Sequence, residues 1–105
     1  MSAPDYSLYI LRCADSSLYT GIAIDVDRRL QEHQNGIRGA KYLRGRAPFK
    51  LVFQQVTGDR SVASQLEYRV KRLDKGQKEA LINGEFPLTG LLREQGTNAT
   101  QASGG

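Results

Sequence analysis

The sequence has 105 residues, a mass of 11.6 kDa and a net charge of +4, from 15 lysines and arginines against 11 acidic residues. This length suits a single domain, and 39% apolar with 25% charged residues is typical of a globular chain rather than a disordered one. The single cysteine, Cys13, and the single histidine, His33, exclude an intrachain disulfide framework, Cys-based zinc sites and mechanisms that need two histidines. The sequence has no membrane-length apolar run and no recognisable secretory signal, so we expect a cytoplasmic protein that does not contact membranes.

A β-hairpin is predicted at the beginning of the chain. Residues 6–12 are rich in aromatic and β-branched side chains, and residues 18–22 form a second short run of the same kind. The Asp and Ser residues within 13–16 indicate the turn between the two strands.

The position of that turn decides how two tyrosines are oriented. A turn centred on Ala14 places Tyr9 and Tyr19 on one face of the hairpin. A turn centred on Asp15 and Ser16 places them on opposite faces. The sequence leaves both registers open.

A helix is predicted after the hairpin. Asp25 is suited to cap its first turn, and Asn35 with Gly36 is suited to end it. Arg29 precedes His33 by four residues, so both side chains lie on one flank of the helix, beside its apolar stripe.

A basic segment follows, in which five cations occur without any acidic residue and two aromatic residues are interleaved. Such a concentration of positive charge is typical of a surface that contacts a phosphate backbone. We also expect a short helix over residues 40–43. The cations are Arg38, Lys41, Arg44, Arg46 and Lys50.

The remaining chain predicts one strand and several helical segments. Residues 49–56 are apolar on both faces, which favours a central strand. A helix begins after Asp59, a further short helix lies within residues 76–82, and a terminal turn at 88–92 docks on the core.

The resulting fold class is α+β, with the order β-β-α-α-β-α-α and a small three-stranded mixed or antiparallel sheet flanked by helices. We expect a single domain over residues 1–92, with its core at about 6–82. Residues 93–105 are small and polar, which favours a disordered tail.

Five motifs, taken in order, resemble the GIY-YIG nuclease family, and in particular its small stand-alone bacterial members of the UPF0213 (YhbQ-like) group. The resemblance covers about residues 6–82. Ser7, Leu8 and Thr20 stand where the family motifs carry glycine or isoleucine, at positions concerned with backbone or packing. The matching segments are Ser7–Tyr9, Tyr19–Gly21, Asp25–His33, Gly39–Tyr42 with Pro48–Val52, and Glu67–Lys71.

The resemblance implies a metal-dependent endonuclease that hydrolyses DNA phosphodiester bonds with low intrinsic sequence selectivity, in DNA repair, recombination or processing. Glu67 would hold one Mg²⁺ or Mn²⁺ ion, bound weakly without substrate, because Mg²⁺ takes further ligands from water and phosphate. Arg29 would stabilise charge on the phosphate. The general base is left open between Tyr9, Tyr19 and His33, since an unperturbed tyrosine has a pKa of about 10.

DNA or RNA is the expected partner, together with an unidentified protein or a second copy of the chain. An alternative is a non-catalytic or partner-dependent module that binds nucleic acid by its structure. An ion pair of Glu67 with Lys71, or of Arg29 with either Glu32 or Asp25, would explain these residues without catalysis. The expected nucleic-acid contacts are Arg38, Lys41, Tyr42, Arg44, Arg46 and Lys71.

Overall fold

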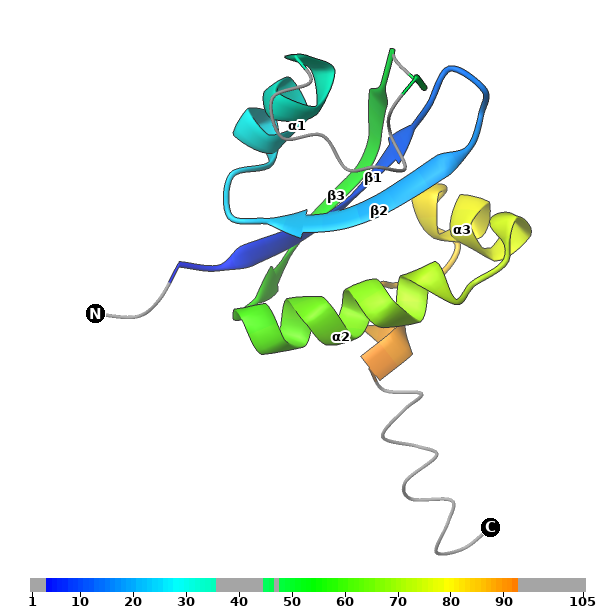
Figure 1. The fold of residues 1–105 in the computed structure, drawn as a ribbon. Coiled ribbons are helices and arrows are strands. Elements are labelled where there is room, and N and C mark those ends of the chain that lie inside the picture. The colour runs from blue at the N-terminus through cyan, green and yellow to red at the C-terminus, as the bar shows by residue number, and fades with distance from the viewer. Residues whose placement is uncertain (1–3, 36–44, 47, 93–105) are drawn as a thin grey trace, which may run out of the picture.

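A computed structural model describes residues 4–35, 45–46 and 48–92 of the chain. Its element order confirms the α+β class (Figure 1). The predicted helix at 40–43 and the predicted tail at 93–105 lie outside the described residues. The elements are β1 (Tyr6–Arg12), β2 (Leu18–Ala23), α1 (Val26–Asn35), β3 (Lys50–Gly58), α2 (Arg60–Lys71) and α3 (Lys75–Ile82).

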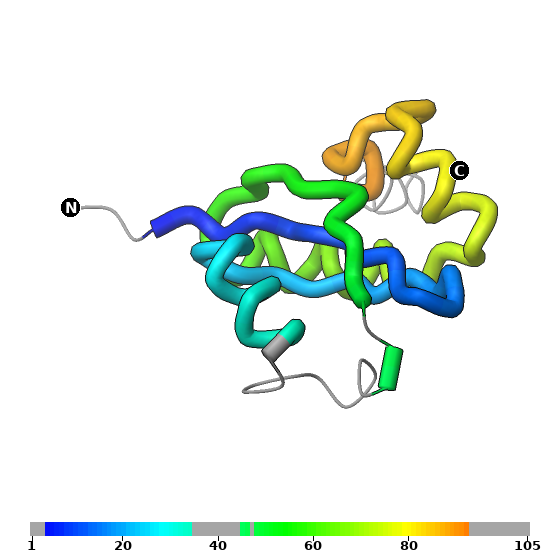
Figure 2. The backbone as a smooth tube through the Cα atoms, turned by 90° about the horizontal axis from the view of Figure 1, so that it is seen from above, coloured from blue at the N-terminus to red at the C-terminus, as the bar shows by residue number. Residues whose placement is uncertain are grey.

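The three strands form an antiparallel sheet in the order β2-β1-β3, in which β1 lies between its two neighbours (Figure 2). The prediction that the third strand is central was therefore wrong. Apolar residues on both faces of β3 mean that both faces are partly covered by other parts of the chain. They do not require a neighbouring strand along each edge. Val56 of β3 is 61% exposed, whereas the five middle residues of β1 are all buried.

The register of the hairpin decides the orientation of the two tyrosines. Tyr9 pairs with Gly21, and Leu11 pairs with Tyr19. Residues directly opposite each other in an antiparallel pair share a face, so Tyr9 and Tyr19 lie diagonally on the same face of the sheet. The pairing is centred on Asp15. This is one residue after Ala14, the turn position that predicted the two tyrosines on one face.

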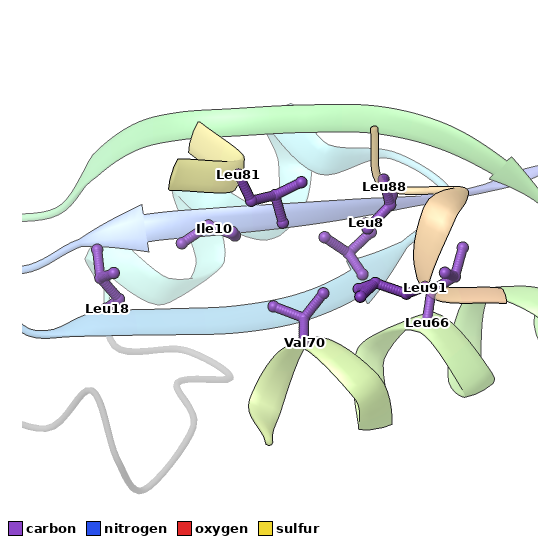
Figure 3. Packing of buried hydrophobic residues seen from close by; sticks show 8 residues of the cluster. All are labelled: Leu8, Ile10, Leu18, Leu66, Val70, Leu81, Leu88 and Leu91. Atoms are coloured by element: carbon purple, nitrogen blue, oxygen red, sulfur yellow. The ribbon is translucent and has the colours of Figure 1, made fainter. Parts of the chain in front are cut away.

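The two faces of the sheet are covered by different helices, α1 on one side and α2 with α3 on the other (Figure 1). The α2 side holds an aliphatic core whose side chains converge between the sheet and the helix (Figure 3). Leu88 and Leu91 are buried in it, as expected for a terminal turn that docks on the core. The core residues are Leu8, Ile10, Leu18, Leu66, Val70, Leu81, Leu88 and Leu91.

Aspartates define the beginnings of the helices, as expected for the first two. The Asp25 carboxylate accepts a hydrogen bond from the Arg28 amide at 3.1 Å, and Asp59 accepts one from the Val62 amide at 2.9 Å. These contacts satisfy amide groups that have no partner inside the first helical turn. They fix where α1 and α2 start, and both starts border the site described next. Among the described residues, no helix has the length and apolar character needed to cross a membrane.

Candidate active site

A cleft of about 720 Å³ crosses the edge strand β2, between α1 on one face of the sheet and α2 on the other. Four of the five predicted catalytic residues line it. Tyr9 comes from the central strand, Tyr19 from β2, Arg29 from α1 and Glu67 from α2. Residues 58 positions apart in the sequence therefore meet at one surface.

His33, the fifth predicted residue, does not line the cleft. It lies behind it and contacts Tyr9, which does line the cleft. The Tyr9 hydroxyl and His33 Nε2 share a hydrogen bond of 3.0 Å. Both side chains are buried, with exposed fractions of 1% and 4%. Tyr19 packs edge-on against the imidazole at a ring-centre distance of 5.7 Å, and its ring centre is 6.3 Å from that of Tyr9. The three rings form a compact cluster under the cleft.

Gly21 makes room for this cluster. A Cβ atom at this position would lie 2.5 Å from the Tyr9 hydroxyl oxygen and 2.6 Å from Cζ. Any larger residue would therefore push the phenol off its position. The glycine of the Tyr-x-Gly motif is a positioning residue, which the sequence had not assigned to the site.

The protonation of the cluster follows from its burial. Desolvation, reinforced by the neighbouring Tyr19, raises the pKa of Tyr9 to about 12, although Arg29 acts in the opposite direction. Desolvation and the positive charge of Arg29 lower the pKa of His33 below 6.5, against the influence of Glu32. At neutral pH Tyr9 is therefore protonated and His33 is neutral.

Arg29 faces the cleft from the flank of α1. Its guanidinium lies 3.7 Å from the Glu32 carboxylate, and Arg28 lies 3.5 Å from the same carboxylate. Within the described residues, the buried Arg29 Nε has no hydrogen-bond partner. A buried N–H group without an acceptor is costly, so a movement of the side chain that brings this atom to an anion in the cleft would be favourable.

Glu67 projects into the cleft from the middle of α2. Lys71, one turn later, lies 3.1 Å from its carboxylate. This contact is the ion pair that the sequence offered as an explanation without catalysis. Such a pair on a helix surface contributes only about 0.5 kcal/mol, so it does not prevent Glu67 from binding another cation.

Of the six predicted nucleic-acid contacts, only Arg46 and Lys71 belong to the described residues. Arg38, Lys41, Tyr42 and Arg44 lie outside the described residues. Arg46 forms an ion pair with Asp15, and its backbone carbonyl accepts a hydrogen bond from the Ala14 amide at 3.0 Å. Arg46 thus ties the segment before β3 to the hairpin turn.

The cleft contains further polar side chains that sequence reasoning did not assign to the site, and four of them lie within the helices α1 and α2. Helical spacing could have indicated them. Arg60 and Ser64 precede Glu67 by seven and three residues, so all three lie on one face of α2. Arg28 and Glu32 lie one turn apart on α1 in the same way. The four side chains are Arg28, Glu32, Arg60 and Ser64.

The fold and this tyrosine-rich cleft define a GIY-YIG catalytic domain, and the model of that domain matches residues 5–80 of the chain. The chain therefore belongs to the GIY-YIG family. It is 54% identical over 82 residues to a UPF0213 protein of Pectobacterium carotovorum. The aligned residues make up 78% of this chain and 82% of that protein. It is 57% identical over 75 residues to the UPF0213 protein YhbQ of Escherichia coli K12, covering 71% of this chain and 74% of YhbQ.

Two structures determined in solution by NMR have similar folds. The UPF0213 protein of Bacillus halodurans is 46% identical, with a TM-score of 0.50 over 75% of this chain and 83% of that one. A protein of E. faecalis is 33% identical, with a TM-score of 0.55 over 78% and 86% of the two chains. These relatives confirm the family expected from the motifs and its small UPF0213 branch.

Proposed function

We propose that this protein is a divalent-metal-dependent endonuclease that hydrolyses DNA phosphodiester bonds with low intrinsic sequence selectivity, in DNA repair, recombination or processing. The observation that carries the proposal is the convergence of Tyr9, Tyr19, Arg29 and Glu67 on one cleft, with His33 bonded behind Tyr9. Phosphodiester hydrolysis needs an activated water and stabilisation of charge on the phosphate. The cleft offers a group for each task.

Arg29 is the proposed phosphate ligand. Its guanidinium borders the cleft, and its unpartnered Nε is a donor that a phosphate oxygen would satisfy. Arginine keeps its charge at any physiological pH and presents donors in a planar fork that matches phosphate oxygens. The ion pair with Glu32 is long, at 3.7 Å, so a phosphate can displace it at low cost.

Tyr9 and His33 are the proposed path for the proton of the attacking water. A tyrosine with a pKa of about 12 is not a tyrosinate at neutral pH, so Tyr9 cannot act as a base by itself. If the phenol passes its proton to His33 Nε2 as it accepts one from water, it never carries a full negative charge. The 3.0 Å hydrogen bond provides that route, and His33 is neutral and able to accept.

Glu67 is the proposed ligand of one Mg²⁺ or Mn²⁺ ion, which when bound would neutralise charge on the scissile phosphate. Across the described residues, no three His, Cys, Asp or Glu side chains are grouped to hold a metal. One carboxylate suits Mg²⁺, which keeps several waters and accepts oxygens from substrate phosphate. We therefore expect weak binding of the ion until nucleic acid is present.

The test is cleavage of supercoiled, linear, single-stranded and flapped DNA by the purified chain with Mg²⁺ or Mn²⁺. Wild type should cut at least one form, and Glu67→Gln and Arg29→Ala should each lower the rate by about 10²-fold or more. Glu85→Gln, an exposed carboxylate outside the cleft, is the matched control and should retain the wild-type rate. Inactivity of the wild type on every form, or full activity of Glu67→Gln, would refute the proposal.

A second candidate function is binding of nucleic acid without hydrolysis, or hydrolysis only with a partner protein. The raised pKa of Tyr9 favours it, because the phenol is not poised as a base in the isolated chain. In that case the wild type would bind DNA with a steep salt dependence and cut none of the forms above.

A further inference from the structure

We propose that the end of the cleft away from His33 is a subsite for the nucleotide that flanks the scissile phosphate, formed by Tyr6, Ile24, Arg60 and Ser64. This inference deepens the proposed function and rests on it for the identity of the ligand. Arg60 would bind a backbone phosphate of the flanking nucleotide, and Ile24 with Tyr6 would contact its sugar or base. All four residues line the same cleft as the predicted catalytic residues.

The strand register brings these residues to one end of the sheet. Tyr6 is paired with Gly58, two residues before Arg60, and Ser7 is paired with Ala23, one residue before Ile24. Tyr9 and Tyr19 lie further along the same strands. The cleft therefore has two ends, one with Tyr9 and Tyr19, behind which His33 lies, and one with Tyr6, Ile24 and Arg60.

Arg60 differs from the other two cleft arginines. Arg28 and Arg29 both contact Glu32, whereas Arg60 is exposed and has no ion pair in the described part of the chain. Its charge is therefore available to an anionic ligand. A guanidinium in this state is suited to a phosphate, since its donors can bind two oxygens together.

The spacing along α2 sets which phosphate Arg60 can reach. Arg60 precedes Glu67 by seven residues, which is a rise of about 10 Å along the helix. One DNA strand rises by only about 3.4 Å per nucleotide. Because the long arginine side chain spans part of this distance, Arg60 is suited to a phosphate that neighbours the one at Glu67, and Ser64 lies between the two residues on the same face of α2.

The apolar component of the subsite is Ile24, which is 52% exposed although it directly follows a strand whose residues are buried or partly buried. An aliphatic side chain exposed at the wall of a cleft can bury apolar area against a ligand that binds there. Tyr6 is held beside it by the sheet, and its backbone carbonyl accepts a hydrogen bond of 2.9 Å from the Thr57 hydroxyl. A sugar or base is the part of a nucleotide that fits between these side chains.

The kinetic test compares a thymidine dinucleotide, which has one phosphodiester and no flanking phosphate, with a longer oligothymidylate. Arg60→Ala should raise KM for the longer substrate by about three- to tenfold with little change in kcat, and Arg60→Lys should recover part of the loss. The dinucleotide should be cleaved with wild-type parameters. Equal losses on both substrates, or no loss on either, would overturn the subsite.

A binding measurement keeps the subsite testable if no cleavage is found. Fluorescence anisotropy of a labelled oligothymidylate should show that Arg60→Ala lowers the magnitude of the log–log salt slope by about 0.7, the value for one phosphate contact on a single strand. Ile24→Ser should weaken binding without changing that slope. Arg69→Ala, on the other flank of α2 and outside the cleft, removes the same charge and should leave the slope unchanged.

The kinetic and the binding measurements together distinguish the proposed nuclease activity from the proposed subsite. Arg60-dependent binding without cleavage would refute the proposed nuclease and retain the subsite. Cleavage that is insensitive to Arg60 on every substrate would retain the nuclease and refute the subsite. An equal effect of Arg69→Ala on binding would show that only net charge matters, which also refutes the subsite.

Discussion

The two faces of the central strand carry different chemistry. Leu8 and Ile10 face α2 and join a core of aliphatic side chains, whereas Tyr9 on the other face joins Tyr19 and His33 under the cleft. The aliphatic face gains stability from burial of apolar area. The aromatic face buries groups that must be desolvated, and it contains polar atoms with no partner in the described part of the chain, His33 Nδ1 and Arg29 Nε. The aliphatic core and the candidate site therefore lie on opposite faces of a single strand.

Buried polar groups without a partner cost free energy, and in the described part of the chain the aliphatic face has only one such atom, Thr20 Oγ1. The difference between the two faces leads to a testable expectation. Changes on the aliphatic face should alter the free energy of unfolding, and changes on the aromatic face should alter activity more than stability.

The largest expected effect is that of Leu66→Ala on the aliphatic face. Leu66 is 1% exposed at the centre of the contact between α2 and the sheet, so its truncation should lower the free energy of unfolding by about 2–5 kcal/mol. Urea denaturation followed by circular dichroism measures this loss. Cleavage per folded molecule should remain near that of wild type; a large loss of it would contradict the separation of the faces.

The second effect is that of Gly21→Ala on the aromatic face. The added Cβ would overlap the Tyr9 hydroxyl, so the phenol must shift; we expect a loss of stability of about 1–3 kcal/mol and a fall in cleavage of about 10²-fold. Denaturation and cleavage rates are measured on the same preparation. The control is Gly76→Ala in α3, where the new Cβ would meet only Asp74 at 3.5 Å, and which should be neutral or slightly stabilising. Unchanged cleavage by Gly21→Ala would show that the position of Tyr9 is irrelevant to the reaction.

A smaller, opposite effect is expected from Thr20→Val. Thr20 pairs with Ile10 on the aliphatic side, and its buried hydroxyl has no hydrogen-bond partner in the described part of the chain. Its replacement should raise the free energy of unfolding by about 1 kcal/mol. Thr57→Val is the matched control, because the Thr57 hydroxyl donates to the Tyr6 carbonyl and its loss should be destabilising. Destabilisation by Thr20→Val would mean that the hydroxyl is satisfied.

The smallest expected effect is a dependence of stability on pH that arises from His33. Its folded pKa is lowered below 6.5 by burial and by Arg29, so the unfolded chain binds the proton more readily. The resulting stability is present above pH 6.5 and is lost as the pH falls through the folded pKa. Thermal unfolding between pH 7 and the onset of carboxylate titration, at about pH 4, measures it. His33→Gln should flatten this dependence, and an unchanged profile would contradict a buried neutral imidazole.

Much of the fold could be predicted because its signals are local. Asp59 before the apolar spacing of α2 located a helix to within a residue, and the aromatic strands located the hairpin. The place of β3 in the sheet could not be read in the same way. Apolar residues on both faces of a strand indicate that other parts of the chain pack above and below it. The neighbours of the strand along the hydrogen-bonding direction depend on the pairing of the whole sheet.

The sequence by itself determined the family and the α+β class, because motif order and helical or strand periodicity are read directly from the chain. The resemblance to the family implied the five residues expected to act together. The tertiary structure decided the rest. It placed Tyr9 and Tyr19 on one face and His33 behind them, and it joined Arg60 and Ser64 to the cleft of Glu67. These relations depend on hairpin register and on the packing of helices from opposite faces across β2, which bring together residues that are distant in the chain.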